Sequence, residues 1–227
     1  MSFEFLVWAP VLLFSMVAHE YAHAEAAYRQ GDSTAYMLGR LTFNPLKHID
    51  PFMTVILPVV LWIASKGTYT FGGAKPVPVN PRNYRNYVKG DVIVSLAGIA
   101  VNLILFVVFA GLFAMVGMLG ARLTTLAPTL EILQRMTFYG MWLNLVLAFF
   151  NLIPIPPLDG SHVMYHLLPA RAGAQYRQLQ LYGFLPIMLL SWFLPGVIGV
   201  FLWPAVQLMT ATLVFLSPLA LPGGVPS

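Results

Sequence analysis

Long apolar segments separated by short polar ones organise the chain. They predict three membrane-crossing helices, at Phe3–Gln30, Asp91–Leu119 and Thr129–Ile153, each longer than the roughly 20 residues that cross a bilayer. Two further apolar segments, Leu179–Leu194 and Gly196–Leu216, predict about two more spans near the C-terminus. The pattern therefore indicates an all-α membrane protein, a polytopic helix bundle with three core spans and about two C-terminal ones.

Three intervening segments do not follow this pattern. Pro51–Ser65 is apolar but too short for a full span and has a central proline, so we expect a re-entrant or interfacial segment. The proline-containing stretch Tyr69–Asn80 predicts a short β-like loop. Arg82–Lys89 is basic and aromatic, which is typical of a membrane interface.

Small residues on the early turns of the second span, Ser95 and Gly98, permit close helix packing.

Composition supports the membrane interpretation. The chain has 227 residues, of which 59% are hydrophobic and 9% charged, with a mean hydropathy of +0.77, whereas a soluble domain has about 25% charged residues. It contains no cysteine, which excludes disulfides and cysteine-ligated metal sites. The net charge of +4 comes from Lys and Arg residues in the loops. We interpret these residues as a signal for the orientation of the protein in the membrane rather than for nucleic-acid binding. We expect one membrane-embedded domain over 1–227, with a core at 3–168 and C-terminal hydrophobic helices at 178–217.

The first span contains the motif His19-Glu20-Tyr21-Ala22-His23, of the form H-E-x-x-H. Four helical residues advance about 400°, so both imidazoles lie on one face, one turn apart. This spacing lets them hold one tetrahedral Zn²⁺, with Glu20 beside them to deprotonate a zinc-bound water. Ionisable residues in a membrane segment are costly and usually functional.

A catalytic zinc site needs a third protein ligand. Asp159 is the best candidate, because it follows a proline-broken span end, where unwound backbone is tolerated only if it lines protein or a water-filled cavity. Asp32 and Asp50 lie in polar loops, and Glu25 is about 240° around the helix from His19.

The remaining histidines leave one alternative open. His162 lies three residues after Asp159 and forms an i, i+4 pair with His166, so it is an alternative metal ligand. His162, His166 and His48 are otherwise interpreted as polar residues near the membrane surface.

Three segments give the chain a resemblance to the site-2 protease family of intramembrane zinc metalloproteases. His19–His23 resembles the family's H-E-x-x-H, and Asn151–Gly160 is similar to its N-x-x-P-x-P-x-L-D-G signature. Ser95–Asn102 resembles its A-G-P-x-x-N segment, with Ile99 where proline is usual. The resemblance covers roughly Leu6 to Leu168, and the chain looks like a minimal member without PDZ or CBS domains.

This resemblance implies a zinc-dependent endopeptidase that cleaves single-span membrane proteins in or near their transmembrane helices, as in regulated intramembrane proteolysis. Glu20 would act as general base and then acid. Asn151 would hydrogen-bond the substrate backbone, and Asn102 would be a further substrate contact. His162 departs from the family, which more often has a basic residue there, so it affects local substrate contacts. The residues that would bind one zinc ion are His19, His23 and Asp159.

Charge predicts the orientation. If Pro51–Ser65 does not cross the bilayer, both motifs end at the same membrane face, and ten of the twelve Lys/Arg residues share that side, leaving Arg122 and Arg135 on the other. If it crosses, the split is seven to five. The positive-inside rule favours the first arrangement. We therefore expect a bacterial or archaeal cell (inner) membrane protein whose active site faces the cytoplasm.

Two rival functions and two interpretations of the loop remain. The rivals are a membrane zinc transporter and a catalytically silent protein that binds membrane helices. A transporter gains nothing from Glu20, and the inverted repeats that are typical of transporters are not visible in the sequence.

The segment Gly72–Asn80 has two possible roles. It either holds unwound substrate as an added strand, through N–H groups such as those of Lys75 and Val77, or plugs the cytoplasmic mouth of the site. No feature indicates an oligomeric state.

Overall fold

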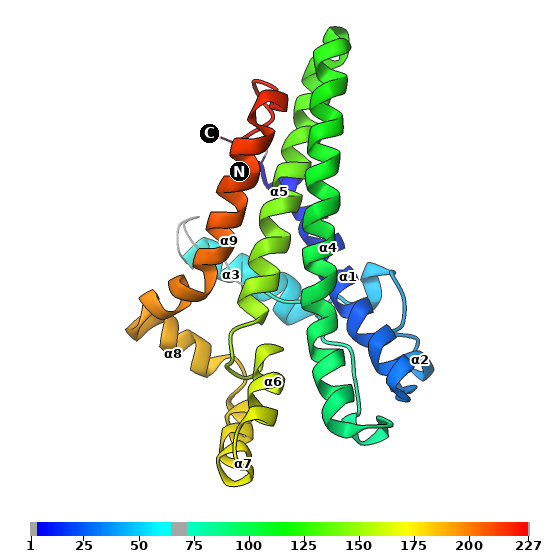
Figure 1. The fold of residues 1–227 in the computed structure, drawn as a ribbon, viewed down its shortest axis with the longest axis vertical. Coiled ribbons are helices and arrows are strands. Elements are labelled where there is room, and N and C mark those ends of the chain that lie inside the picture. The colour runs from blue at the N-terminus through cyan, green and yellow to red at the C-terminus, as the bar shows by residue number, and fades with distance from the viewer. Residues whose placement is uncertain (1–3, 65–71, 227) are drawn as a thin grey trace. The chain divides into compact units, whose positions relative to one another are not determined.

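The computed structural model describes residues 4–64 and 72–226, and these residues form helices and connecting segments without strands (Figure 1). The all-α class is thereby confirmed. The helices are α1 Glu4–Gln30, α2 Thr34–Met37, α3 Leu57–Ala64, α4 Tyr87–Arg122, α5 Ala127–Asn151, α6 Gly160–Leu167, α7 Ala170–Gln178, α8 Leu185–Phe193 and α9 Pro195–Leu216.

Within the described residues, three helical segments are long and apolar enough to cross a membrane: Glu4–Gln30, Tyr87–Arg122 and Gly196–Leu219. The protein is accordingly an integral membrane protein with several spans. The third expected core span is helical as α5 but is not among these three segments; it contains polar residues such as Gln134, Arg135 and Asn144.

The C-terminal region differs from the expectation of two spans, because only α9 has spanning length. The preceding segment begins with a 3₁₀ turn at Leu179–Tyr182 and is broken at Gly183, whose φ of +54° lies in the left-handed region that favours glycine. The remaining helix, α8, has 9 residues and cannot cross a bilayer.

The structure describes residues 51–64 and 72–80 of the segments that depart from the pattern of long apolar spans. Pro51–Ile56 forms a π-helical turn that continues into α3, and the whole is too short to span the hydrocarbon core. Residues 72–80 are extended without strand pairing. The first part of the predicted β-like loop, at 69–71, lies outside the described residues.

Packing divides the chain into two compact units. The first unit comprises Met1–Ser15 and Ile99–Ser227, and the second comprises Met16–Gly98. In the first unit, α4, α5 and α9 run alongside one another (Figure 1) and bury one apolar cluster between them. Its buried members are Phe106, Phe113, Met141, Leu145, Ala205, Met209 and Leu216. The core of this unit is therefore built from the consecutive helices α4 and α5 together with α9, which is distant from them in sequence.

A buried polar chain crosses the same unit. Asn102 donates from Nδ2 to Asn144 Oδ1 at 2.8 Å. Asn144 in turn donates to Ser15 Oγ at 2.9 Å and to the Gly140 carbonyl at 2.8 Å. Asn102, Asn144 and Ser15 are all 0% exposed, and side-chain hydrogen bonds of this kind link helices in a membrane setting.

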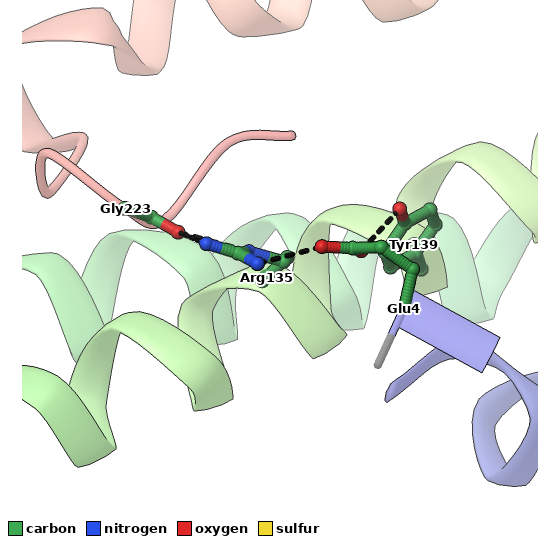
Figure 2. Close-up of polar contacts among 4 residues, drawn as sticks. All are labelled: Glu4, Arg135, Tyr139 and Gly223. Carbon is green, nitrogen blue, oxygen red and sulfur yellow. Dashed lines mark hydrogen bonds and ion pairs between the residues drawn. The ribbon is translucent and has the colours of Figure 1, made fainter. Parts of the chain in front are cut away.

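The C-terminal tail is tied to α5 by two adjacent side chains. Arg135 donates from Nε and Nη2 to the Gly223 carbonyl at 3.0 and 2.6 Å, and from Nη1 to Glu4 at 2.6 Å (Figure 2). Tyr139 donates to the other Glu4 oxygen. Gln134, fully buried, donates to the carbonyls of Phe113 and Leu219 and accepts from the Leu221 N–H. Both chain ends are thus held by α5.

In the second unit, Asp32 ties the end of α1 to the segment that leads into α4. Its carboxylate, 0% exposed, accepts hydrogen bonds from the Asn80 N–H at 2.6 Å and from Asn83 Nδ2 at 2.8 Å. Thr34 adds an N–H donor at 3.1 Å and a hydroxyl donor at 2.5 Å. Burial alone would raise the pKa of Asp32, but these hydrogen bonds outweigh it and lower the pKa from its ordinary value.

Replacing Gln134 tests the tail attachment. Gln134→Ala should destabilise the protein by about 1–3 kcal/mol, because it leaves buried backbone groups of the tail without partners. For a chain of this size that is a drop in Tm of roughly 2–12 °C, measured by thermal unfolding in detergent. Gln175→Ala, at an exposed site on α7, is the matched control and should leave Tm unchanged; equal Tm values for the two variants would show that the tail contributes no stability.

Candidate metal centre

The histidine pair lies in the second half of α1. As the i, i+4 spacing predicts, the Nε2 atoms of His19 and His23 face each other, 3.0 Å apart. Two nitrogen ligands of one tetrahedral zinc, at Zn–N distances of about 2.0–2.1 Å, lie about 3.3 Å from each other. The pair is therefore already spaced for one metal ion, and His19 is only 8% exposed.

A backbone carbonyl of α4 fixes the tautomer of one histidine. His23 Nδ1 lies 2.7 Å from the Val94 oxygen. Because a carbonyl can only accept, Nδ1 carries the hydrogen, and the lone pair is on Nε2, the atom that faces His19. Metal-binding histidines are commonly held in this way by a partner on the other ring nitrogen. The residues present thus fit a zinc ion by both spacing and protonation.

Gly98 lets α4 approach the pair. A Cβ at this position would lie 2.5 Å from His19 Cε1 and 2.5 Å from His23 Nε2. Such distances are far inside van der Waals contact, so any side chain there would displace the imidazoles. The small residue that the sequence assigns to general helix packing therefore has a specific place beside the metal ligands.

Glu20 is directed toward the extended segment 72–80. Its Oε2 accepts a hydrogen bond from the backbone N–H of Val77 at 2.7 Å. The N–H of Lys75 is also used, by the His48 carbonyl at 2.8 Å. Two of the N–H groups expected to pair with an added substrate strand are therefore occupied by the protein itself. The contact of Val77 with Glu20 could not be predicted from the sequence, because Val77 makes it through its backbone N–H and not through its side chain.

The other predicted site residues lie in the first unit. Asp159 immediately precedes α6, with helical backbone angles of φ −59° and ψ −39°. Asn151 is the last residue of α5 and donates from Nδ2 to the Leu147 carbonyl at 2.9 Å. Asn102 is buried in the polar chain described above, which favours a role in linking helices over one in substrate contact.

The remaining histidines differ in their surroundings. His48, expected to be a polar residue near the membrane surface, is 1% exposed within the fold, and its Nε2 donates to the Thr42 carbonyl at 2.8 Å. His162 lines a small pocket with Tyr165, Tyr176 and Arg177. The pKa of Tyr176 is raised by burial. His166 packs edge-on against the Tyr165 ring.

Comparison with known proteins points to the same chemistry. Residues 7–194 match the sequence model described as Peptidase family M50. The chain is 40% identical over 195 residues to "Putative zinc metalloprotease YwhC" of Bacillus subtilis, covering 85% of this chain and 82% of that protein. It is 35% identical over 181 residues to "Putative zinc metalloprotease Rip2" of Mycolicibacterium smegmatis, covering 78% of this chain and 63% of that protein. No solved structure matches the chain.

Gly98 offers a test of the metal centre. Gly98→Ala should lower the zinc content well below one ion per chain, because the added methyl group displaces both imidazoles. Gly111→Ala, on the same helix but with nothing within 4 Å of the added carbon, is the matched control and should keep its zinc. Metal analysis of the purified proteins decides; full zinc occupancy in Gly98→Ala would contradict the close packing.

Proposed function

The chain belongs to peptidase family M50, and we propose that this membrane zinc metalloprotease is an intramembrane endopeptidase of the site-2 type. Its substrates are single-span membrane proteins, cut in or near their transmembrane helices during regulated proteolysis. The observation that carries the proposal is the His19–His23 pair, set at metal-binding distance in a helix long and apolar enough to enter the bilayer. A histidine site inside a membrane span gives a protease access to peptide bonds there.

We further propose that Asp159 is the third zinc ligand. It is the acidic residue of the segment that follows α5, and the backbone turns there from one helix into the next. The match of Asn151–Gly160 to the family signature supports this choice, as does the requirement for a third ligand in catalytic zinc sites. With two neutral imidazoles and one carboxylate, the ligand set resembles that of other zinc peptidases.

The chemistry is divided between the metal and the chain. Zinc, when bound, supplies an acidified water and polarises the scissile carbonyl. Glu20, next to His19 in the sequence, accepts the proton of the attacking water and returns it to the leaving amine. Asn151, at the end of α5, hydrogen-bonds the substrate backbone beside the cleaved bond. The site works only on an unwound segment, because a helix hides its carbonyls in internal hydrogen bonds.

The proposed orientation places the site toward the cytoplasm of a bacterial cell. Its support is the distribution of Lys and Arg, ten of twelve on one side when Pro51–Ala64 does not cross the membrane. The shortness of that helical segment, a π-helical turn of 6 residues followed by 8 residues in α3, agrees with this topology.

Glu20→Gln tests the hydrolytic function. The variant should lose at least about 100-fold in cleavage of a single-span substrate, the usual contribution of a general base. It should keep one zinc per chain, because the ligands are untouched. Cleavage is measured with purified protein in detergent and zinc by metal analysis. A zinc-loaded Glu20→Gln variant with wild-type turnover would refute this role of Glu20, whereas a zinc-loaded wild-type protein that cleaves no single-span substrate would favour a transport or binding function.

Asp159→Ala and His162→Ala decide the third ligand. Loss of a ligand lowers metal affinity, so Asp159→Ala should lose most of its zinc, whereas His162→Ala should keep it near one per chain. Thermal unfolding of both proteins, with and without added zinc, checks that each is folded. The reverse order of zinc contents would make His162 the ligand.

A further inference from the structure

We propose that the backbone N–H of Val77 is a positioning group for Glu20, and that Arg40 and Asp32 act through the extended segment 72–80 to hold it there. This inference rests on the proposed function, since it concerns the residue assigned as general base. All the residues involved lie in the unit Met16–Gly98.

The contact itself is short and charge-assisted. The Val77 N–H donates to Glu20 Oε2 at 2.7 Å, a typical distance for a hydrogen bond to a carboxylate. A glutamate side chain has three rotatable bonds, so it needs an external partner to remain in one orientation. A backbone donor is well suited to this task, because it has no rotamers of its own. The other oxygen, Oε1, is left to take part in proton transfer.

Packing holds Val77 against the helix that bears Glu20. The Val77 side chain, 7% exposed, contacts a buried cluster with Ala24 and Ala35, which are 0% and 1% exposed. Ala24 lies one helical turn after Glu20, on the same face of α1. The distance between the Val77 backbone and Glu20 is therefore set by close-packed apolar atoms.

Polar tethers hold the segment on both sides of Val77. Before it, Arg40 donates to the Lys75 carbonyl at 2.9 Å and more weakly to that of Pro76 at 3.4 Å. After it, the Asn80 N–H donates to Asp32 at 2.6 Å. Arg40 is 9% exposed and Asp32 0%, so both tethers are shielded from water.

Two prolines make Val77 the sole donor at this point. Pro76 and Pro78 flank it; neither has an N–H, and both restrict φ. The segment therefore offers one N–H to Glu20 and little freedom to move it. A lid that must open for catalysis would have to break the packing and both tethers, so the contact is better explained as a fixed part of the site than as a latch.

The test removes the N–H without changing the side chain. A backbone ester at position 77, introduced with the α-hydroxy analogue of valine, should lower kcat roughly 10- to 100-fold, as expected for a misplaced catalytic group. KM should stay within about twofold and zinc at one per chain, since neither substrate binding nor ligands are touched. The same ester at Val79 is the matched control and should keep wild-type kcat.

Arg40→Ala provides a second variant that acts at a distance. It should lower kcat in the same direction without loss of zinc, and Arg40→Lys should restore part of the rate by supplying one donor. The proposal is overturned if the ester at 77 raises kcat, which would identify a latch. It is also overturned if the ester raises KM alone, which would identify a substrate contact, or if kcat is unchanged. Glu20→Gln, assayed in parallel, distinguishes the two hypotheses: cleavage by that variant refutes the assignment of Glu20 as general base, whereas an inactive Glu20→Gln beside a fully active ester refutes only the role of Val77.

Discussion

The need to hold two imidazoles 3.0 Å apart inside an apolar helix governs the architecture of this protein. Nitrogen ligands in a membrane segment carry a desolvation cost, which is acceptable only when each polar atom has a partner. The Val94 carbonyl supplies one such partner to His23. That carbonyl can reach the imidazole only because α4 comes close, and α4 comes close only because position 98 is glycine.

The same rule applies to several other buried polar groups. Asp32 receives four hydrogen bonds, Asn144 joins three helices, and Gln134 satisfies backbone groups of the tail. In a protein so rich in apolar side chains, apolar contacts alone discriminate poorly between alternative helix packings, since lipid is an equally good partner for them. Directional hydrogen bonds between buried groups supply the missing specificity.

The extended segment 72–80 likewise depends on directional hydrogen bonds between buried groups. Its prolines remove donors and limit backbone freedom, while the N–H groups of Val77 and Lys75 donate to Glu20 and to the His48 carbonyl. This explains why so short a segment without regular structure is anchored by buried side chains at both ends. A general base is useful only in a defined orientation, and a backbone held on both sides provides it at low entropic cost.

The sequence by itself determined the features that depend on local spacing. The helices, the facing histidines, the apolar spans and the family all follow from periodicity and motifs, because helix geometry places residues four apart on one face whatever surrounds them. Contacts between distant residues could not be read in this way. His23 and Val94 are 71 positions apart in the sequence, and Glu20 and Val77 are 57 apart. Only tertiary packing brings each pair together, and Val94 and Val77 act through backbone atoms rather than through their side chains. The burial of His48 and the break of the C-terminal apolar segment at Gly183 likewise depended on tertiary structure: hydropathy measures how apolar a segment is, whereas packing and backbone conformation decide where its residues lie.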